Sequence, residues 1–237
     1  MRTTTSSALL ATLAFAAACS SGSPTNPSGT TAETTYTGVF ATGSQSGSFV
    51  ISTASTAADV WAGSASGVAA ASGTTRSAHG TITILGGSAT QVNGTFNPAT
   101  GAFALAGGVF SLAVTVDATA QVSGTITVSG AAGVASGVAS TSTVSVTRYC
   151  GTFTGSNSGR LNLTIAGTTI TGVAVGNGDG GGTVLNGTVS GTTATIHWIP
   201  DPGQLGTATG TITSSGITNG VWTSEQESGT WSATAGC

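Results

Sequence analysis

Apolar and polar residues alternate with a period of two along most of the chain from Tyr36 onward. One example is the segment 110–116, where every second residue is apolar, namely Phe110, Leu112, Val114 and Val116. The same alternation returns at 122–128 and at 161–165. Strands of an antiparallel sheet with one buried face and one solvated face show this pattern. We therefore expect an all-β fold without long helices.

Turn-forming residues separate these short segments. Gly, Asn and Ser cluster between them, and no long helical pattern intervenes. Many short strands joined by such turns are typical of antiparallel up-and-down meanders, which close into barrels or stack as sandwiches. We expect a first meander unit at 36–147 and a second at 148–237, arranged as two tandem small barrels or sandwiches.

Short motifs recur between the two expected units. The three pairs are SG at 46–47 with SG at 158–159, VNGTF at 92–96 with LNGTV at 185–189, and GTIT at 124–127 with GTIT at 210–213. Chance matches are common in a sequence so rich in Gly and Thr, but recurrence in a fixed order is the signature of a repeat. We interpret the two units as diverged copies of an internal repeat, with shorter loops in the second.

Composition excludes one large class of partner. Charged residues make up only 5% of the chain, there is no Lys, and the formal net charge is −3. Without a basic patch to neutralise phosphates, nucleic-acid binding is not expected. The chain has 38 Gly, but its regularly spaced apolar positions are unlike those of disordered chains. We expect a folded protein whose exposed face carries Thr and Ser hydroxyls in place of charges.

The first residues have the features of a secretory leader. Met1-Arg2 supplies a positive start, and a short apolar stretch ends in three Ala residues before Cys19. This stretch resembles the lipobox of bacterial lipoproteins, which implies that 1–18 is removed and that Cys19 carries lipid. In that family Ser20, the next residue, implies sorting to the outer membrane where the cell has one. An ordinary signal peptidase would cut at the same bond and leave Cys19 unmodified.

Residues 19–35 have no apolar periodicity and are predicted to form a flexible tether after the lipidated Cys19. The expected location is extracytoplasmic, with the membrane as a partner through the N-terminal lipid. The apolar stretch of the leader is too short to span a bilayer as a helix. The lipid would therefore be the anchor.

The chain has three cysteines, an odd number that calls for an explanation in a secreted protein. If lipid occupies Cys19, then Cys150 and Cys237 remain to form a disulfide; a free or intermolecular Cys19 is the alternative. A Cys150–Cys237 bond would join the first and last strands of the second unit, which meet only if the sheet curls shut. In the general character of its sequence, the second unit loosely resembles avidin-like or lipocalin-like barrels.

One cluster could bind a ligand. His197 and Trp198 are adjacent, and Trp222 and Trp231 follow on later segments. Aromatic faces with a few polar groups suit a small molecule or a sugar. Large aromatic residues also dominate core energetics, and few others are present in this half, so we favour a core role for the three Trp residues. These four residues are the possible ligand-binding set.

No catalytic or metal site can be assembled from the sequence. The run 176–181 fits G-x-G-x-x-G, but a strand follows it where a dinucleotide site needs a helix. Two His residues cannot form a three-histidine zinc site, and no nucleophile motif is present. We expect no enzyme activity, metal or cofactor. The expected function is a structural or binding role in the cell envelope, with an envelope protein as a possible partner; the alternative is a carrier that holds a small molecule or glycan in the second barrel.

Overall fold

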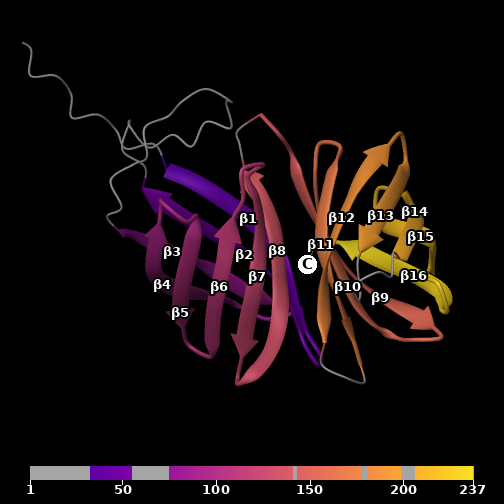
Figure 1. The fold of residues 1–237 in the computed structure, drawn as a ribbon, viewed down its shortest axis with the longest axis horizontal. Coiled ribbons are helices and arrows are strands. Elements are labelled where there is room, and N and C mark those ends of the chain that lie inside the picture. Colours follow the sequence, from indigo (N-terminus) through magenta and orange to yellow (C-terminus); the bar gives the residue numbers. More distant parts are fainter. Residues whose placement is uncertain (1–32, 55–74, 141–142, 178–180, 199–205, 237) are drawn as a thin grey trace, which may run out of the picture. The chain divides into compact units, whose positions relative to one another are not determined.

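Two closed eight-stranded barrels follow one another along the chain in the computed structural model, which describes residues 33–54, 75–140, 143–177, 181–198 and 206–236 (Figure 1). Within each barrel every strand pairs antiparallel with its neighbour in sequence, and no helix occurs in these ranges. The predicted all-β fold of antiparallel meanders is therefore confirmed. Each meander closes into a barrel, so the sandwich alternative does not apply.

Barrel 1 contains the first eight strands. They are β1 (Glu33–Thr42), β2 (Ser46–Ala54), β3 (Arg76–Ile84), β4 (Ala89–Asn97), β5 (Ala102–Gly107), β6 (Phe110–Val116), β7 (Gln121–Val128) and β8 (Ala131–Ser140). The first and last strands pair, from Thr35 opposite Ser140 to Thr42 opposite Gly133. This pairing leaves the sheet without a free edge, because closure alone removes edges from a sheet.

Barrel 2 contains the last eight strands. They are β9 (Val146–Gly155), β10 (Gly159–Ala166), β11 (Thr169–Gly176), β12 (Gly182–Ser190), β13 (Thr193–Trp198), β14 (Gly206–Ile212), β15 (Gly216–Thr223) and β16 (Ser228–Ala235). It closes between β9 and β16, from Tyr149 opposite Ala235 to Gly155 opposite Gly229. The strand ends at which β9, β11, β13 and β15 finish all lie at the same end of the barrel, because consecutive strands run in opposite directions.

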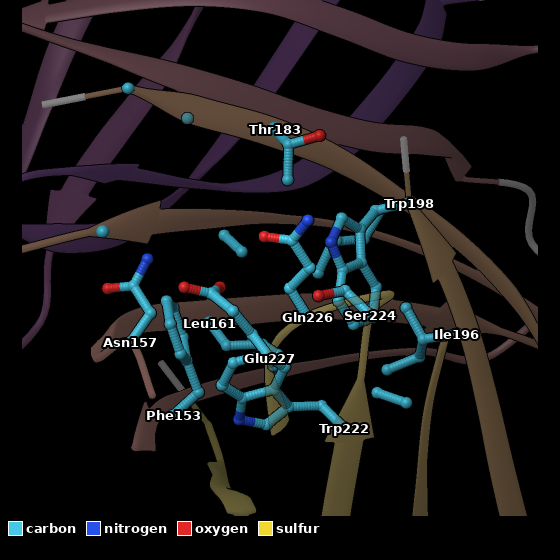
Figure 2. Close-up of a pocket in the computed structure, with 16 residues that line it drawn as sticks. Phe153, Asn157, Leu161, Thr183, Ile196, Trp198, Trp222, Ser224, Gln226 and Glu227 are labelled. Carbon is cyan, nitrogen blue, oxygen red and sulfur yellow. The ribbon is translucent and has the colours of Figure 1, made fainter. Parts of the chain in front are cut away.

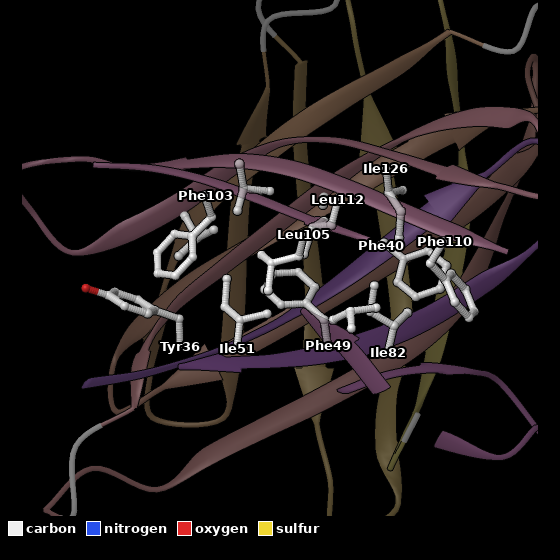
Figure 3. Packing of buried hydrophobic residues seen from close by; sticks show 14 of the residues in the cluster. Tyr36, Phe40, Phe49, Ile51, Ile82, Phe103, Leu105, Phe110, Leu112 and Ile126 are labelled. Atoms are coloured by element: carbon white, nitrogen blue, oxygen red, sulfur yellow. The ribbon is translucent and has the colours of Figure 1, made fainter. Parts of the chain in front are cut away.

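The alternating pattern places one set of side chains inside each barrel. In β6 all four apolar residues of the alternating set are buried, while the three residues between them are exposed. The interior of barrel 1 also contains six buried aromatic residues, Tyr36, Phe40, Phe49, Phe96, Phe103 and Phe110. Figure 3 labels Tyr36, Phe40, Phe49, Phe103 and Phe110 among the aliphatic side chains of this core. Their rings make edge contacts, such as Tyr36 with Phe103 at 5.5 Å between centroids. Aromatic and aliphatic side chains together pack this barrel's core.

Strand bounds differ slightly from the expected units. β1 begins at Glu33, three residues before Tyr36, and β9 begins at Val146, two residues before Arg148. The leader and most of the predicted tether lie outside the described residues, as do Cys19 and Cys237.

The recurring motifs fall on strands of equal rank in only part of the chain. The first pair precedes or begins the second strand of each barrel, and the motifs at Val92 and Leu185 lie in β4 and β12, the fourth strands. The third pair does not correspond, because Gly124 lies in the seventh strand of its barrel and Gly210 in the sixth. An internal repeat remains a hypothesis, carried by the shared topology and two motif pairs.

The two barrels share a small apolar cluster within one compact unit of the chain. Val39 and Ala41 of β1 pack with Val173 and Val175 of β11. Beside them, the side chain of Asn162 is fully buried and its Nδ2 donates a 2.6 Å hydrogen bond to the backbone oxygen of Phe40. The outer faces of β1, β10 and β11 are therefore buried, which the alternating pattern alone would have assigned to solvent.

Candidate functional site

A cavity of about 530 Å³ opens at one end of barrel 2 (Figure 2). This volume lies in the range of small-molecule pockets, about 300–1,000 Å³. Every strand of the barrel except β16 contributes a lining residue, and the turns after β9 and β15 and the residue that precedes β12 add the rest. The cavity is therefore a property of barrel closure, since its walls come from segments far apart in the sequence.

The cavity exists because inward positions near this end carry short side chains. Ala174 of β11 and Ala208 of β14 line it, together with Gly176 and Gly182. Larger aliphatic residues, Leu161, Leu185 and Ile196, form the apolar part of the wall. These three are buried in the core of barrel 2, so the cavity continues directly from the packed interior.

Three aromatic rings stand around this space. The ring centroids of Trp198 and Trp222 are 6.4 Å apart at 60°, and those of Phe153 and Trp222 are 5.9 Å apart at 84°. Such tilted and edge-to-face pairs are favourable because of the ring quadrupoles. Trp222 is 6% exposed and its Nε1 donates a 3.0 Å hydrogen bond to the backbone oxygen of Thr154, which fixes its ring. Trp198 is half-buried at the rim.

The rim is polar. Asn157, Ser224, Gln226 and Glu227 lie in the turns after β9 and β15 and line the opening (Figure 2). The second turn is closed by a 2.8 Å hydrogen bond from the Ser224 amide to the Glu227 oxygen. Glu227 is the one ionisable side chain among the described residues of the lining. The site thus joins an apolar interior to a polar mouth with one negative charge.

Of the four possible ligand-binding residues, two line the cavity and two do not. Trp198 and Trp222 line it. His197 is exposed on the opposite face of β13, because Ile196 and Trp198 on either side of it face inward. Trp231 is 3% exposed and packed in the core, where its Nε1 donates a 3.0 Å hydrogen bond to the Thr209 oxygen.

Sequence reasoning missed most of the lining. Phe153, Leu161 and Ile196 occupy inward positions of strands, and an alternating pattern alone does not distinguish a cavity wall from a packed core. Glu227 lies in the turn between β15 and β16, as does Glu225. The turns after β9 and β15 share one end of the barrel, and that tertiary relationship is what brings the rim residues together.

The described residues add nothing to a metal site or to a membrane-spanning helix, and they leave the disulfide untested. In the ranges that the structure describes, no group of three or more His, Cys, Asp and Glu side chains could hold a metal ion. The same ranges contain no helix long and apolar enough to cross a membrane. Cys150 is 7% exposed in β9 and is not free. The pairing of Cys150 with Cys237 remains a prediction, because Cys237 lies outside the described residues.

Two tyrosines are perturbed by their surroundings but lie away from the cavity. Burial raises the pKa of the Tyr36 and Tyr149 hydroxyls above the ordinary value. Both residues belong to the barrel cores, one to each barrel. Their neutral form is therefore the one present near pH 7.

Comparison of the chain with protein families, with curated proteins and with solved structures finds no match.

Proposed function

We propose that barrel 2 is a binding module that holds a small molecule with an apolar body in its open end. The observation that carries this proposal is the cavity of about 530 Å³ between the rings of Phe153, Trp198 and Trp222. A barrel evolved only as a scaffold gains stability from a filled interior, since empty space forfeits packing contacts. Barrel 1, with six buried aromatic residues, has the composition of such a filled scaffold.

The chemistry of the wall favours an apolar body over a sugar. Leu161, Leu185 and Ile196 present only hydrocarbon, and apart from the tryptophan N–H groups Thr183 is the one polar side chain among the described strand residues of the lining. Sugar hydroxyls placed against the three aliphatic residues would lose their hydrogen bonds to water without replacement, which costs free energy. An apolar or aromatic group gains from leaving water instead. Polar groups of the ligand would lie at the rim.

We further propose that the protein is anchored in the cell envelope by lipid on Cys19, with barrel 2 as a carrier held outside the cytoplasm. The support is the leader and the three-residue Ala run that precedes Cys19. The mature protein should label with palmitate and partition into detergent, and Cys19→Ser should abolish both. Equal labelling of that variant would end this part of the proposal.

Binding can be measured with the neutral apolar dye N-phenyl-1-naphthylamine, whose fluorescence rises when it leaves water. Trp198→Ala removes one aromatic wall, and Ala174→Phe fills space in the cavity with a ring. Trp198→Ala should weaken dye binding about tenfold or more, by loss of the buried apolar contact of one ring. Ala174→Phe should weaken it to a similar extent, because the added ring occupies space that the dye needs. His197→Ala is the matched control, because His197 neighbours Trp198 but lies on the other face of β13.

The expected result is weak binding in both cavity variants and unchanged binding in the control. If all three variants bind the dye as the parent protein does, the cavity of barrel 2 is not the binding site. Circular dichroism of each variant shows whether the barrel has remained folded, so that lost binding is not confused with lost structure.

A further inference from the structure

The geometry points to an organic cation as the ligand of this cavity: an apolar body inside barrel 2 and a positively charged head between the aromatic rings and Glu227. This inference rests on the proposed binding function and narrows it to one chemical class. Three independent features of the site carry it: the ring faces, the charge of the rim, and the placement of the arginines in barrel 2.

Three aromatic rings, those of Phe153, Trp198 and Trp222, line the cavity. The indole N–H of Trp222 is already used in its hydrogen bond to the Thr154 oxygen, so this ring offers a ligand its π system and not a donor. Phe153 has no polar atom, and it meets Trp222 edge to face. A cation over such faces is attracted by the ring quadrupole, and the attraction grows when the cation is desolvated.

The rim adds a negative charge on a turn whose backbone is hydrogen-bonded to the opposite side of the opening. Glu227 precedes Ser228, whose backbone oxygen accepts hydrogen bonds from both the amide and the hydroxyl of Ser156. These bonds pin the turn after β15 to the turn after β9 on the other side of the opening. Glu225 adds a second carboxylate to the same four-residue turn but does not line the cavity.

The positive charges of barrel 2 are committed elsewhere. Its two arginines are Arg148 and Arg160. Arg148 donates a 3.0 Å hydrogen bond from Nη1 to the Ser48 hydroxyl, and Arg160 donates a 2.8 Å bond from Nη2 to the Ser44 oxygen. Both acceptors belong to barrel 1, so neither guanidinium is directed to Glu227. The carboxylate is therefore available to a cationic ligand and repels an anionic one.

Three probes with one aromatic body separate charge from hydrophobicity. They are 1-naphthylmethyl-trimethylammonium, the neutral 1-naphthalenemethanol and the anionic 1-naphthylacetate, each titrated into the full mature chain by calorimetry. The cation should bind about fivefold to thirtyfold more tightly than the neutral probe, as expected for one desolvated cation–π contact. The anion should bind most weakly, and the preference for the cation should shrink at high salt.

Two variants locate the charge. Glu227→Gln keeps the shape of the side chain and should reduce affinity for the cation about fivefold while leaving the neutral probe unchanged. Glu225→Gln, in the same exposed turn, should change neither by more than about twofold, because Glu225 does not line the cavity and a ligand held there would not contact it.

Each outcome has a distinct meaning. If the three probes bind with equal affinity, the cation inference is overturned while the binding function stands. If Glu225→Gln lowers the affinity for the cationic probe as much as Glu227→Gln does, the rim contributes only a general electrostatic field and the assigned role of Glu227 is wrong. If no probe binds and N-phenyl-1-naphthylamine also fails, the proposed function falls with the inference.

Discussion

The indole of Trp222 reaches across a neighbouring strand to the backbone of Thr154, where its Nε1 donates a 3.0 Å hydrogen bond. Trp222 is in β15 and Thr154 in β9, and β16 lies between them with Gly229 directly opposite Trp222. A Cβ on Gly229 would lie 2.5 Å from the indole nitrogen and closer still to the Thr154 oxygen. Because residue 229 has no side chain, Trp222, which lines the cavity, can also form a hydrogen bond from β15 across β16 to β9.

Gly229→Ala should disturb both stability and binding. The added methyl group has no room, and overpacking of this kind costs about 1–3 kcal/mol. We expect a lower melting temperature and weaker dye binding, because the Trp222 ring must move. Gly43→Ala is the control, since a Cβ there would have no atom within 4 Å. Equal melting curves for the two variants would show that the Trp222–Thr154 bond is not held in this way.

The tryptophans of barrel 2 should differ in their contribution to stability. Trp231 is 3% exposed and hydrogen-bonded, so Trp231→Ala should cost about 3–5 kcal/mol of unfolding free energy, and Trp222→Ala a similar amount. Trp198 is half-buried at the rim and should cost less, about 1–2 kcal/mol, because it has fewer contacts to lose. Urea denaturation measures all three. A ranking with Trp198 as the most costly would contradict the described packing.

Asn162→Asp should destabilise the contact between the barrels. The fully buried Asn162 donates to the Phe40 oxygen, and its own Oδ1 has no partner among the described residues. A carboxylate there would face a carbonyl oxygen and be buried without a counter-charge, which costs about 3 kcal/mol or more. Asn186→Asp makes the same change at an exposed position of β12 and should be nearly neutral. Similar melting temperatures for the two variants would refute the buried contact.

The proposed disulfide between Cys150 and Cys237 should staple the closing strands of barrel 2. The amide of Gly236 donates a 2.9 Å hydrogen bond to the Arg148 oxygen, so the last described residue lies beside β9. Gly236 follows the end of β16 and has a φ of 90°. Peptide mapping without reductant should recover the linked pair, and Cys150→Ala should lower stability by about 4–5 kcal/mol in the chain-entropy picture. Recovery of both thiols in free form would exclude the bond.

Asp117 should make stability depend on pH. Slight burial raises the pKa of this carboxyl. Hydrogen bonds from the Thr119 side chain and from the Gln121 and Thr119 backbones lower the pKa by more than burial raises it, so the net pKa is below the ordinary value. A group with a depressed folded-state pKa stabilises the protein above the ordinary carboxyl pKa, and this contribution is lost as pH falls through the folded value.

Asp117→Asn keeps one acceptor oxygen but cannot ionise. The parent protein should be more stable than this variant at about pH 7, and the difference should vanish at about pH 2, where the parent carboxyl is protonated. Melting temperatures of both proteins across that range provide the measurement. A difference that persists unchanged at the acidic end would mean that shape, and not charge, matters in the turn between β6 and β7.

The sequence by itself determined the class of fold. Alternation in β6 placed Phe110, Leu112, Val114 and Val116 on one face, and all four are buried. This inference succeeds because side-chain direction in a strand depends only on the chain's own period of two. The same rule explains why His197 and Trp198, although adjacent, lie on opposite faces of β13.

Only the tertiary structure decided whether barrel 2 is filled or hollow. The cavity depends on short residues at Ala174 and Ala208, which are distant in sequence and line one cavity only when eight strands close into a ring. Closure likewise separates the roles of the tryptophans, with Trp198 and Trp222 on the cavity wall and Trp231 in the packed core. Facing direction is a local property of the backbone, whereas the volume left between facing side chains is a sum over strands, which no single segment contains.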